Sequence, residues 1–283
     1  MCQIFEVSRS SFYDWQQGKT HVLKPKKAAL NEQIKEIFDE HKRRYGSRRI
    51  EAELKDLGVD AGRYQIRKRM QENGLKAIQP KSFVPKTTQT NPNLKRSPNL
   101  LLEMDSVDQL NKVWVGDITY LPMADKSWTY LATWMDLNSR LIVGWQISES
   151  LEASIALDSL KKAIMWRYPK SGLIIHTDGG GQYMDQEFRQ LLWDNKYQQS
   201  MTRVENHYDN AFAESLFSRF KAELLDGKVF EDLKQVRAKT FEYIEVYYNR
   251  KRRHSSIRYM SPETFETNWE QHENCQRTKL KMQ

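Results

Sequence analysis

The chain has 283 residues and a formal net charge of +8 at pH 7, and its sequence pI is about 9.2. Its two cysteines exclude a disulfide framework and a four-cysteine zinc site. We find neither a signal peptide nor an apolar stretch long enough to cross a membrane, and we therefore expect a soluble intracellular protein.

The basic residues are concentrated in the first third of the chain. Residues 1–100 contain 21 lysines and arginines and 11 acidic residues, whereas the remaining 183 residues contain 24 and 26. This asymmetry is typical of a polyanion-binding module followed by a nearly neutral catalytic one. A basic surface that only keeps the protein soluble is the alternative.

The first predicted element is a short helix within residues 1–20, which we interpret as the end of a partial helix-turn-helix. Ser8 can cap this helix, and Phe12 and Trp15 follow three residues apart. A helical arm that packs on another part of the protein is the alternative interpretation.

Residues 31–78 predict three helices with the apolar periodicity of a small bundle, and we interpret them as a helix-turn-helix DNA-binding domain. In the third helix, Arg63 and Arg67 lie one turn apart, opposite Ile66 and Met70. Such a face fits the major groove, where arginine reads guanine edges and lysine contacts phosphate. The residues of this domain expected to bind DNA are Arg48, Arg49, Arg63, Arg67 and Lys68.

Residues 79–111 predict a basic linker, because four prolines interrupt a mostly polar stretch. The linker either follows the DNA backbone or serves as a solvated tether. At the other end of the chain, residues 267–283 are polar and are expected to form a loose tail.

Residues 112–266 predict an α/β domain. Three segments rich in β-branched and aromatic residues, 113–121, 128–136 and 141–148, predict an antiparallel meander. Further along, we expect helices over residues 153–168, 185–195, 210–225 and 231–248, and a buried strand over 171–178.

Two acidic residues occupy distinctive positions in this domain. Asp178 follows the buried strand and precedes Gly179–Gly181, which permit a sharp turn and the close approach of a bulky group. Glu214 lies on the helix over residues 210–225, away from its apolar stripe. The 35 residues that separate Asp178 from Glu214 mean little by themselves in a chain with 37 acidic residues.

The residues around these acids resemble a known family. HTDGGGQY around Asp178 and YDNAFAESLFSRFKAEL around Glu214 resemble the second and third acidic motifs of the D,D-35-E integrase core. The resemblance is most specific to the second-frame transposases of the bacterial insertion sequence 3 (two-frame) family, and it extends over residues 31–266. It implies that Asp117, in the strand VWVGDITY, is the first acidic residue.

The resemblance also implies a fold. It is the ribonuclease H-like fold, with the order strand, strand, strand, helix, strand, helix, strand, helix and a mixed five-stranded sheet. In this fold a central parallel pair of strands sets Asp117 and Asp178 side by side, and the helix of Glu214 packs across them.

The activity implied by the resemblance is that of a transposase, which binds the ends of an insertion sequence and cleaves and joins DNA strands. Phosphodiester transfer must activate a hydroxyl and stabilise a leaving alkoxide, and divalent cations held by carboxylates do both. The implied cofactor is Mg²⁺, with Mn²⁺ as a substitute and two ions per site, bound by Asp117, Asp178 and Glu214.

The resemblance further implies DNA contacts outside the helix-turn-helix. Lys221 is implied to approach the DNA backbone near the acidic residues. Arg252 and His254 belong to the run YNRKRRHSSIRYMSPETFE, which resembles the closing pattern of the family. We expect these two residues to contact phosphates, and a charged helix end is the alternative.

The implied partners are double-stranded DNA, as element ends and as target, further copies of the chain on DNA, and the product of an upstream reading frame, fused or separate. The implied location is the nucleoid in the bacterial cytoplasm. Two other functions are a non-catalytic DNA-binding protein derived from a transposase and a nuclease of the same fold that acts on RNA hybrids. The intact carboxylates argue against the first, and the basic helix-turn-helix argues against the second.

The sequence departs from the family pattern in two places. Gly179–Gly181 stand where Arg-Gly-Ser is usual, and Val204, Glu205 and His207 stand where lysine, glycine and cysteine are usual. Both changes remove positive charge near the DNA, and we therefore expect a weaker affinity for target DNA.

Overall fold

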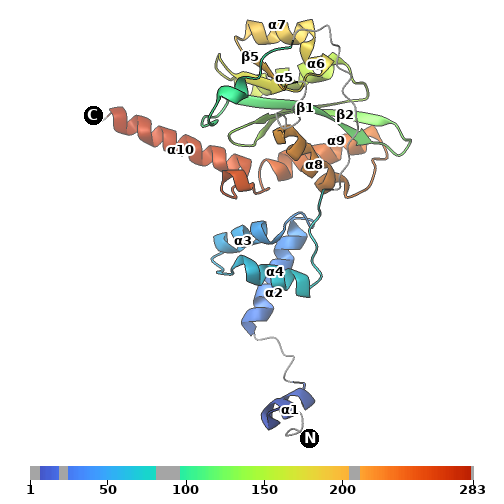
Figure 1. Cartoon of the computed structure of the whole chain (residues 1–283), viewed down its shortest axis with the longest axis vertical. Coiled ribbons are helices and arrows are strands. Elements are labelled where there is room, and N and C mark those ends of the chain that lie inside the picture. Colours follow the sequence, from blue (N-terminus) through green and yellow to red (C-terminus); the bar gives the residue numbers. More distant parts are fainter. Residues whose placement is uncertain (1–6, 19–24, 81–95, 204–210, 282–283) are drawn as a thin grey trace. The chain divides into compact units, whose positions relative to one another are not determined.

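The computed structural model describes residues 7–18, 25–80, 96–203 and 211–281 (Figure 1). For residues 25, 211–214, 273, 274 and 276–281 it describes the backbone alone. The chain divides into two compact units, Met1–Ile78 and Gln79–Gln283. Among the helices of these ranges, none is both long enough and apolar enough to cross a membrane.

The N-terminal unit is entirely helical in its described part. The short helix α1 (Arg9–Gln16) begins where the sequence predicted, because the Ser8 hydroxyl accepts a hydrogen bond from the Ser11 N–H at 3.1 Å. The three helices of the predicted helix-turn-helix follow as α2 (Pro25–Glu40), α3 (Ser47–Asp56) and α4 (Arg63–Glu72). Their shared core contains Ile34, Phe38, Ile50, Leu54, Ile66 and Met70.

The second unit is built on a mixed five-stranded sheet in the order β3-β2-β1-β4-β5. The predicted meander is confirmed as β1 (Val113–Pro122), β2 (Trp128–Asp136) and β3 (Ile142–Ser148), which pair in antiparallel fashion. Two short strands, β4 (Ile174–Thr177) and β5 (Gln198–Met201), extend the sheet in parallel with β1.

Helices cover both faces of this sheet (Figure 1). On one face, α5 (Ala153–Arg167), α6 (Gly181–Met184) and α7 (Gln186–Asp194) enclose the main apolar core, whose largest members are Trp114, Trp134, Tyr183 and Phe188. On the other face lie α8 (Ala211–Leu225) and α9 (Leu233–Phe241), the latter continued by the π-helical η4 (Glu242–Tyr248). The chain continues through η5 (Ser255–Ile257) into α10 (Pro262–Lys281).

Residues 96–111, which we expected in the linker, pack onto the sheet. They include η2 (Leu100–Glu103), and Leu101, Met104 and Val107 pack against the buried residues Val113 and Val115. The linker is therefore shorter at its C-terminal end than the sequence suggested, because apolar side chains between its polar residues find a surface of the core.

The tail predicted as loose over residues 267–283 is also different, since α10 continues to Lys281. Pro262 occupies the first helical position, where its fixed φ favours a helix, and no glycine or proline follows it. The hydroxyl of Ser261 accepts a hydrogen bond from the Thr264 N–H at 3.3 Å and so caps the helix. Polar composition alone was thus a poor guide to disorder in this segment.

Candidate active site

The parallel pairing of β1 with β4 brings two of the predicted acidic residues together. Val115 is the register partner of His176 in this pairing. Asp117 and Asp178 each follow their partner by two residues, so the register places them level with each other and on the same side of the sheet. The side-by-side arrangement expected for this pair follows from the observed topology.

Asp178 lies just beyond the end of β4, in the turn formed by the glycines. Its Oδ1 atom accepts a hydrogen bond from the Gly180 N–H at 3.0 Å. Burial raises the pKa of Asp178, although the Gly180 N–H and the positive charge of Arg96 act in the opposite direction. Asp117 is half-buried in β1, and its Oδ1 atom accepts a hydrogen bond from the Ile118 N–H at 2.8 Å.

Tyr183 completes the buried side of this acidic pair, and we did not predict it as a site residue. Its hydroxyl is buried and forms no hydrogen bond within the described part of the chain. Burial raises the pKa of Tyr183 well above its ordinary value, and the charges of Asp117 and Asp178 raise it further. The phenol oxygen therefore lies close to both carboxylates, and its position in the HTDGGGQY motif is the signal that could have indicated it.

Lys221 of α8 lies near the same acidic pair. The helix packs against β1, and the Lys221 side chain is half-buried there. Burial lowers the pKa of Lys221, while the negative charge of Asp117 acts to raise it, so the two side chains are close. Glu214 lies two turns earlier on α8, and its side chain lies outside the described residues.

The donor set fits a hard divalent cation. Asp117 and Asp178 provide carboxylate oxygens, the ligands that Mg²⁺ prefers, and the burial of Asp178 makes a nearby positive charge favourable. No group of three His, Cys, Asp or Glu side chains that could hold a metal occurs in the described part of the chain. The predicted third ligand, Glu214, is outside that search because its side chain is not described.

Arg252 occupies a different environment from the one we expected, because its side chain is buried and not directed at solvent. It forms an ion pair with Glu223 of α8, with 2.7 Å between Nη2 and Oε1, and only 3% of each side chain is exposed. The Tyr243 hydroxyl donates a further hydrogen bond to Glu223 at 2.8 Å. A guanidinium held in this way cannot reach a DNA phosphate, so the DNA-binding role predicted for Arg252 is wrong.

His254 is half-buried and contacts the same network. Its Nε2 atom lies 3.1 Å from Nη1 of Arg252, and its ring packs edge-on against Tyr248 with 4.8 Å between ring centroids. These contacts explain why the basic run in this segment does not form one exposed surface. Its exposed basic residues are Arg250, Lys251 and Arg258.

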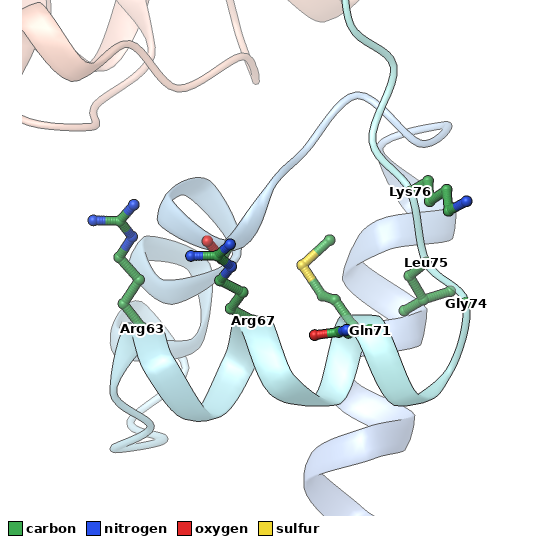
Figure 2. Close-up of a pocket in the computed structure, with 8 residues that line it drawn as sticks. Arg63, Arg67, Gln71, Gly74, Leu75 and Lys76 are labelled. Atoms are coloured by element: carbon green, nitrogen blue, oxygen red, sulfur yellow. The ribbon is translucent and has the colours of Figure 1, made fainter.

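The five residues of the helix-turn-helix that were predicted to bind DNA differ in their exposure and contacts. Arg63 and Arg67 point to the same side of α4, where they line a cleft of about 440 Å³ together with Ser47, Met70, Gln71, Gly74, Leu75 and Lys76 (Figure 2). Arg48 and Lys68 are exposed but do not line this cleft. Arg49 is half-buried, with its guanidinium 5.4 Å from the ring centroid of Tyr45 and a 3.2 Å hydrogen bond to the Arg44 carbonyl.

The remaining departures from the family pattern, Val204, Glu205 and His207, lie outside the described residues. Two other polar residues of the sheet, His176 and Asp136, are held by hydrogen bonds. His176 is buried, with Nδ1 at 2.8 Å from the Ser200 hydroxyl. The carboxylate of Asp136 accepts hydrogen bonds from the backbone N–H groups of Asn111, Asn138 and Ser139 and so fixes the turn after β2.

Comparison with protein families gives matches for both units. Residues 108–207 and residues 195–262 each match a family described as integrase core domain, and residues 25–83 match a family described as HTH-like domain. Among solved structures, the catalytic core domain of BIV integrase matches with a TM-score of 0.42 and 17% identity, covering 58% of this chain and 99% of that one.

Curated relatives match over most of the chain. The transposase for insertion sequence element IS904 of Lactococcus lactis is 38% identical over 237 residues, which are 84% of this chain and 93% of the relative. Transposase InsF for insertion sequence IS3A of Escherichia coli strain K12 is 35% identical over 268 residues, or 94% of this chain and 92% of the relative. With such identity over nearly the whole length of both relatives, the chain belongs to the insertion sequence 3 (IS3) family of transposases.

Proposed function

We propose that this transposase binds the ends of its insertion sequence through the N-terminal unit and cleaves and joins DNA strands at Asp117, Asp178 and Glu214. The observation that carries the proposal is the parallel register of β1 and β4, which sets Asp117 level with Asp178 next to Lys221. Paired carboxylates can bind divalent cations, and a lysine beside them can bind a DNA phosphate. Metal-dependent cleavage of a DNA strand needs both.

The three acidic residues would hold Mg²⁺, or Mn²⁺ in its place, with two ions per site. When bound, these cations supply activation of the attacking hydroxyl and stabilisation of the leaving alkoxide. Lys221 would attract a phosphate of the DNA backbone toward Asp117, because its charge lies on the same face of the site. The buried Tyr183 phenol would stay protonated beside these carboxylates, because burial and their charges raise its pKa.

In the N-terminal unit, Arg63 and Arg67 would contact DNA from α4, with Arg48 and Lys68 as further exposed positive charges.

Transposition needs two element ends and a target, so we expect the chain to work as a homo-oligomer on double-stranded DNA. The upstream-frame product, fused or separate, would contribute to end binding. Since the DNA substrate is chromosomal, we expect the protein to act at the nucleoid in the bacterial cytoplasm.

The test compares three isosteric variants, Asp117→Asn, Asp178→Asn and Glu214→Gln, with the exposed Asp158→Asn of α5 as a matched control. The probe is a labelled duplex that carries the terminal repeat flanking the gene, and strand transfer is followed with Mg²⁺, Mn²⁺ or EDTA. We expect the three site variants to lose joining and to keep end binding, while the control keeps both activities.

Two results would contradict the proposal. Joining by any of the three site variants at near the wild-type rate would remove that residue from the site. End binding without any metal-dependent joining by the wild-type protein, alone or fused behind the upstream frame, would favour a non-catalytic DNA-binding protein.

A further inference from the structure

A short segment that leads into the catalytic unit passes along β5, and we call residues 96–99 the strap. It follows the strand without being part of the sheet. Three hydrogen bonds hold this region: the Met201 N–H donates to the Pro98 carbonyl at 3.2 Å, the Leu100 N–H donates to the Ser200 hydroxyl at 2.9 Å, and the Ser97 hydroxyl donates to Gln199 Oε1 at 2.8 Å. The backbone on the C-terminal side of Arg96 is therefore fixed relative to the sheet.

From this position, Arg96 extends to the glycine turn after β4. A Cβ atom on Gly179 would lie 2.3 Å from Cζ of Arg96 and 2.5 and 2.6 Å from its two terminal nitrogens. Such distances are shorter than real Cβ contacts, so the guanidinium occupies the space that a side chain at residue 179 would fill. Arg96 can take this position because Gly179 has no side chain.

This arrangement places a positive charge beside Asp178. Arg96 is close enough to Asp178 to favour the charged form of its carboxylate. We expected positive charge to be missing here, because glycines stand where the family pattern has Arg-Gly-Ser. The strap brings an arginine from 83 residues earlier in the chain to the same place, so that expectation is corrected for this side of the site.

We propose that Arg96 is a substrate-binding residue that holds a phosphate of the DNA strand reacting at Asp117 and Asp178. A guanidinium has five N–H donors in a planar fork that matches a phosphate, so an arginine whose charge acts on a nearby carboxylate can also bind a phosphate. This inference rests on the proposed function.

The experiment uses the full chain, Mg²⁺ and the labelled terminal-repeat duplex, and compares Arg96→Ala and Gly179→Ala with the exposed Arg237→Ala of α9, which removes the same charge. A charge-assisted contact to phosphate predicts that Arg96→Ala raises the KM for the duplex about 10-fold. It also predicts that the slope of log affinity against log salt falls by about one contact. The Mg²⁺ concentration for half-maximal rate and the melting temperature should stay at wild-type values, and Arg237→Ala should leave the KM unchanged.

Gly179→Ala tests the same contact without touching the arginine. Its Cβ atom displaces the end of a flexible side chain, so the protein should fold and should show a raised KM like that of Arg96→Ala. The double variant should be no worse than Arg96→Ala, because both changes remove one interaction. Additive effects of the two changes would overturn the proposal.

The remaining outcomes distinguish failure of the Arg96 proposal from failure of the proposed function. A wild-type KM and salt slope for Arg96→Ala would overturn the phosphate contact. A changed Mg²⁺ requirement with an unchanged KM would also overturn it, and would make Arg96 a charge partner of Asp178 alone. If Asp178→Asn still joins strands, the proposed function itself fails, whatever Arg96→Ala does.

Discussion

Gly116 lies directly against the indole ring of Trp134, its cross-strand partner on β2, so that a Cβ atom on Gly116 would come within 2.1 Å of the ring atom Cζ3. The ring cannot move away easily. Its Nε1–H donates a hydrogen bond to the buried Ser159 hydroxyl at 2.9 Å, and it stacks on Phe188 with 6.0 Å between ring centroids. The residue immediately before Asp117 is therefore held to glycine by the packing of the core.

Replacing Gly116 with alanine should destabilise the protein by about 1–3 kcal/mol, the usual cost of forcing an extra group into a packed core. Urea denaturation at equilibrium measures this change in the free energy of unfolding. Gly181→Ala is the control, because a Cβ atom there meets nothing within 4 Å and the backbone has an ordinary φ. Equal stability of the two variants would show that Trp134 can yield.

Breaking the buried pair of Arg252 and Glu223 should cost about 3–5 kcal/mol, since either single change leaves a charge buried without its partner. We expect Arg252→Met and Glu223→Met each to lower the melting temperature strongly. The double variant should recover much of the loss, because it removes both charges. Arg250→Ala, from the same basic run but exposed, should leave stability nearly unchanged. A stable Arg252→Met protein with weakened DNA binding would restore the role that the sequence suggested.

Removing Arg67 should reduce the affinity for the element end by about 1–3 kcal/mol, mostly as lost preference over a scrambled duplex, if α4 reads bases in a major groove. Band-shift titrations with the two duplexes at one salt concentration measure both quantities. Lys35→Ala, an exposed lysine of α2, serves as the control. An equal loss on both duplexes would instead assign Arg67 to phosphate contact within the cleft in Figure 2.

Removing Lys221 should slow strand transfer by a factor of about 10², because its charge lies near Asp117, where negative charge develops on the phosphate. The preference between element end and scrambled duplex should not change. Single-turnover kinetics with prebound DNA separates the two effects, and Lys228→Ala, an exposed lysine just after α8, is the control. A normal single-turnover rate would remove Lys221 from the chemical step.

Much of this fold could be predicted from the sequence because its elements carry local signals. The meander strands are rich in β-branched and aromatic residues, and their predicted bounds differ from β1, β2 and β3 by one residue at most. The acidic pair was predictable because a family motif surrounds it and the parallel register then aligns Asp117 with Asp178. The position of the Glu214 side chain stays a prediction.

The features that escaped prediction depend on distant partners. Arg252 resembles a surface arginine within its basic run, and its burial depends on Glu223, which lies 29 residues earlier on α8. In the sequence, Arg96 looks like one more basic residue of a linker. Its role becomes visible only in the fold, which places it beside Gly179, 83 residues later in the chain. Neither pairing leaves a periodic signal in the sequence, because periodicity reports which face of an element is buried and not what lies against it.

The strap has a practical consequence for how the catalytic unit can be isolated. β5 is an outer strand of the sheet, and the Pro98 carbonyl accepts the hydrogen bond of its outward Met201 N–H. A fragment that starts at residue 112, the boundary suggested by the sequence, would lack this cover and would offer unpaired backbone groups to other chains. Uncovered edges of this kind promote edge-to-edge aggregation. A fragment that starts before Arg96 keeps the strap on the outer strand β5, and we expect this fragment to stay monodisperse.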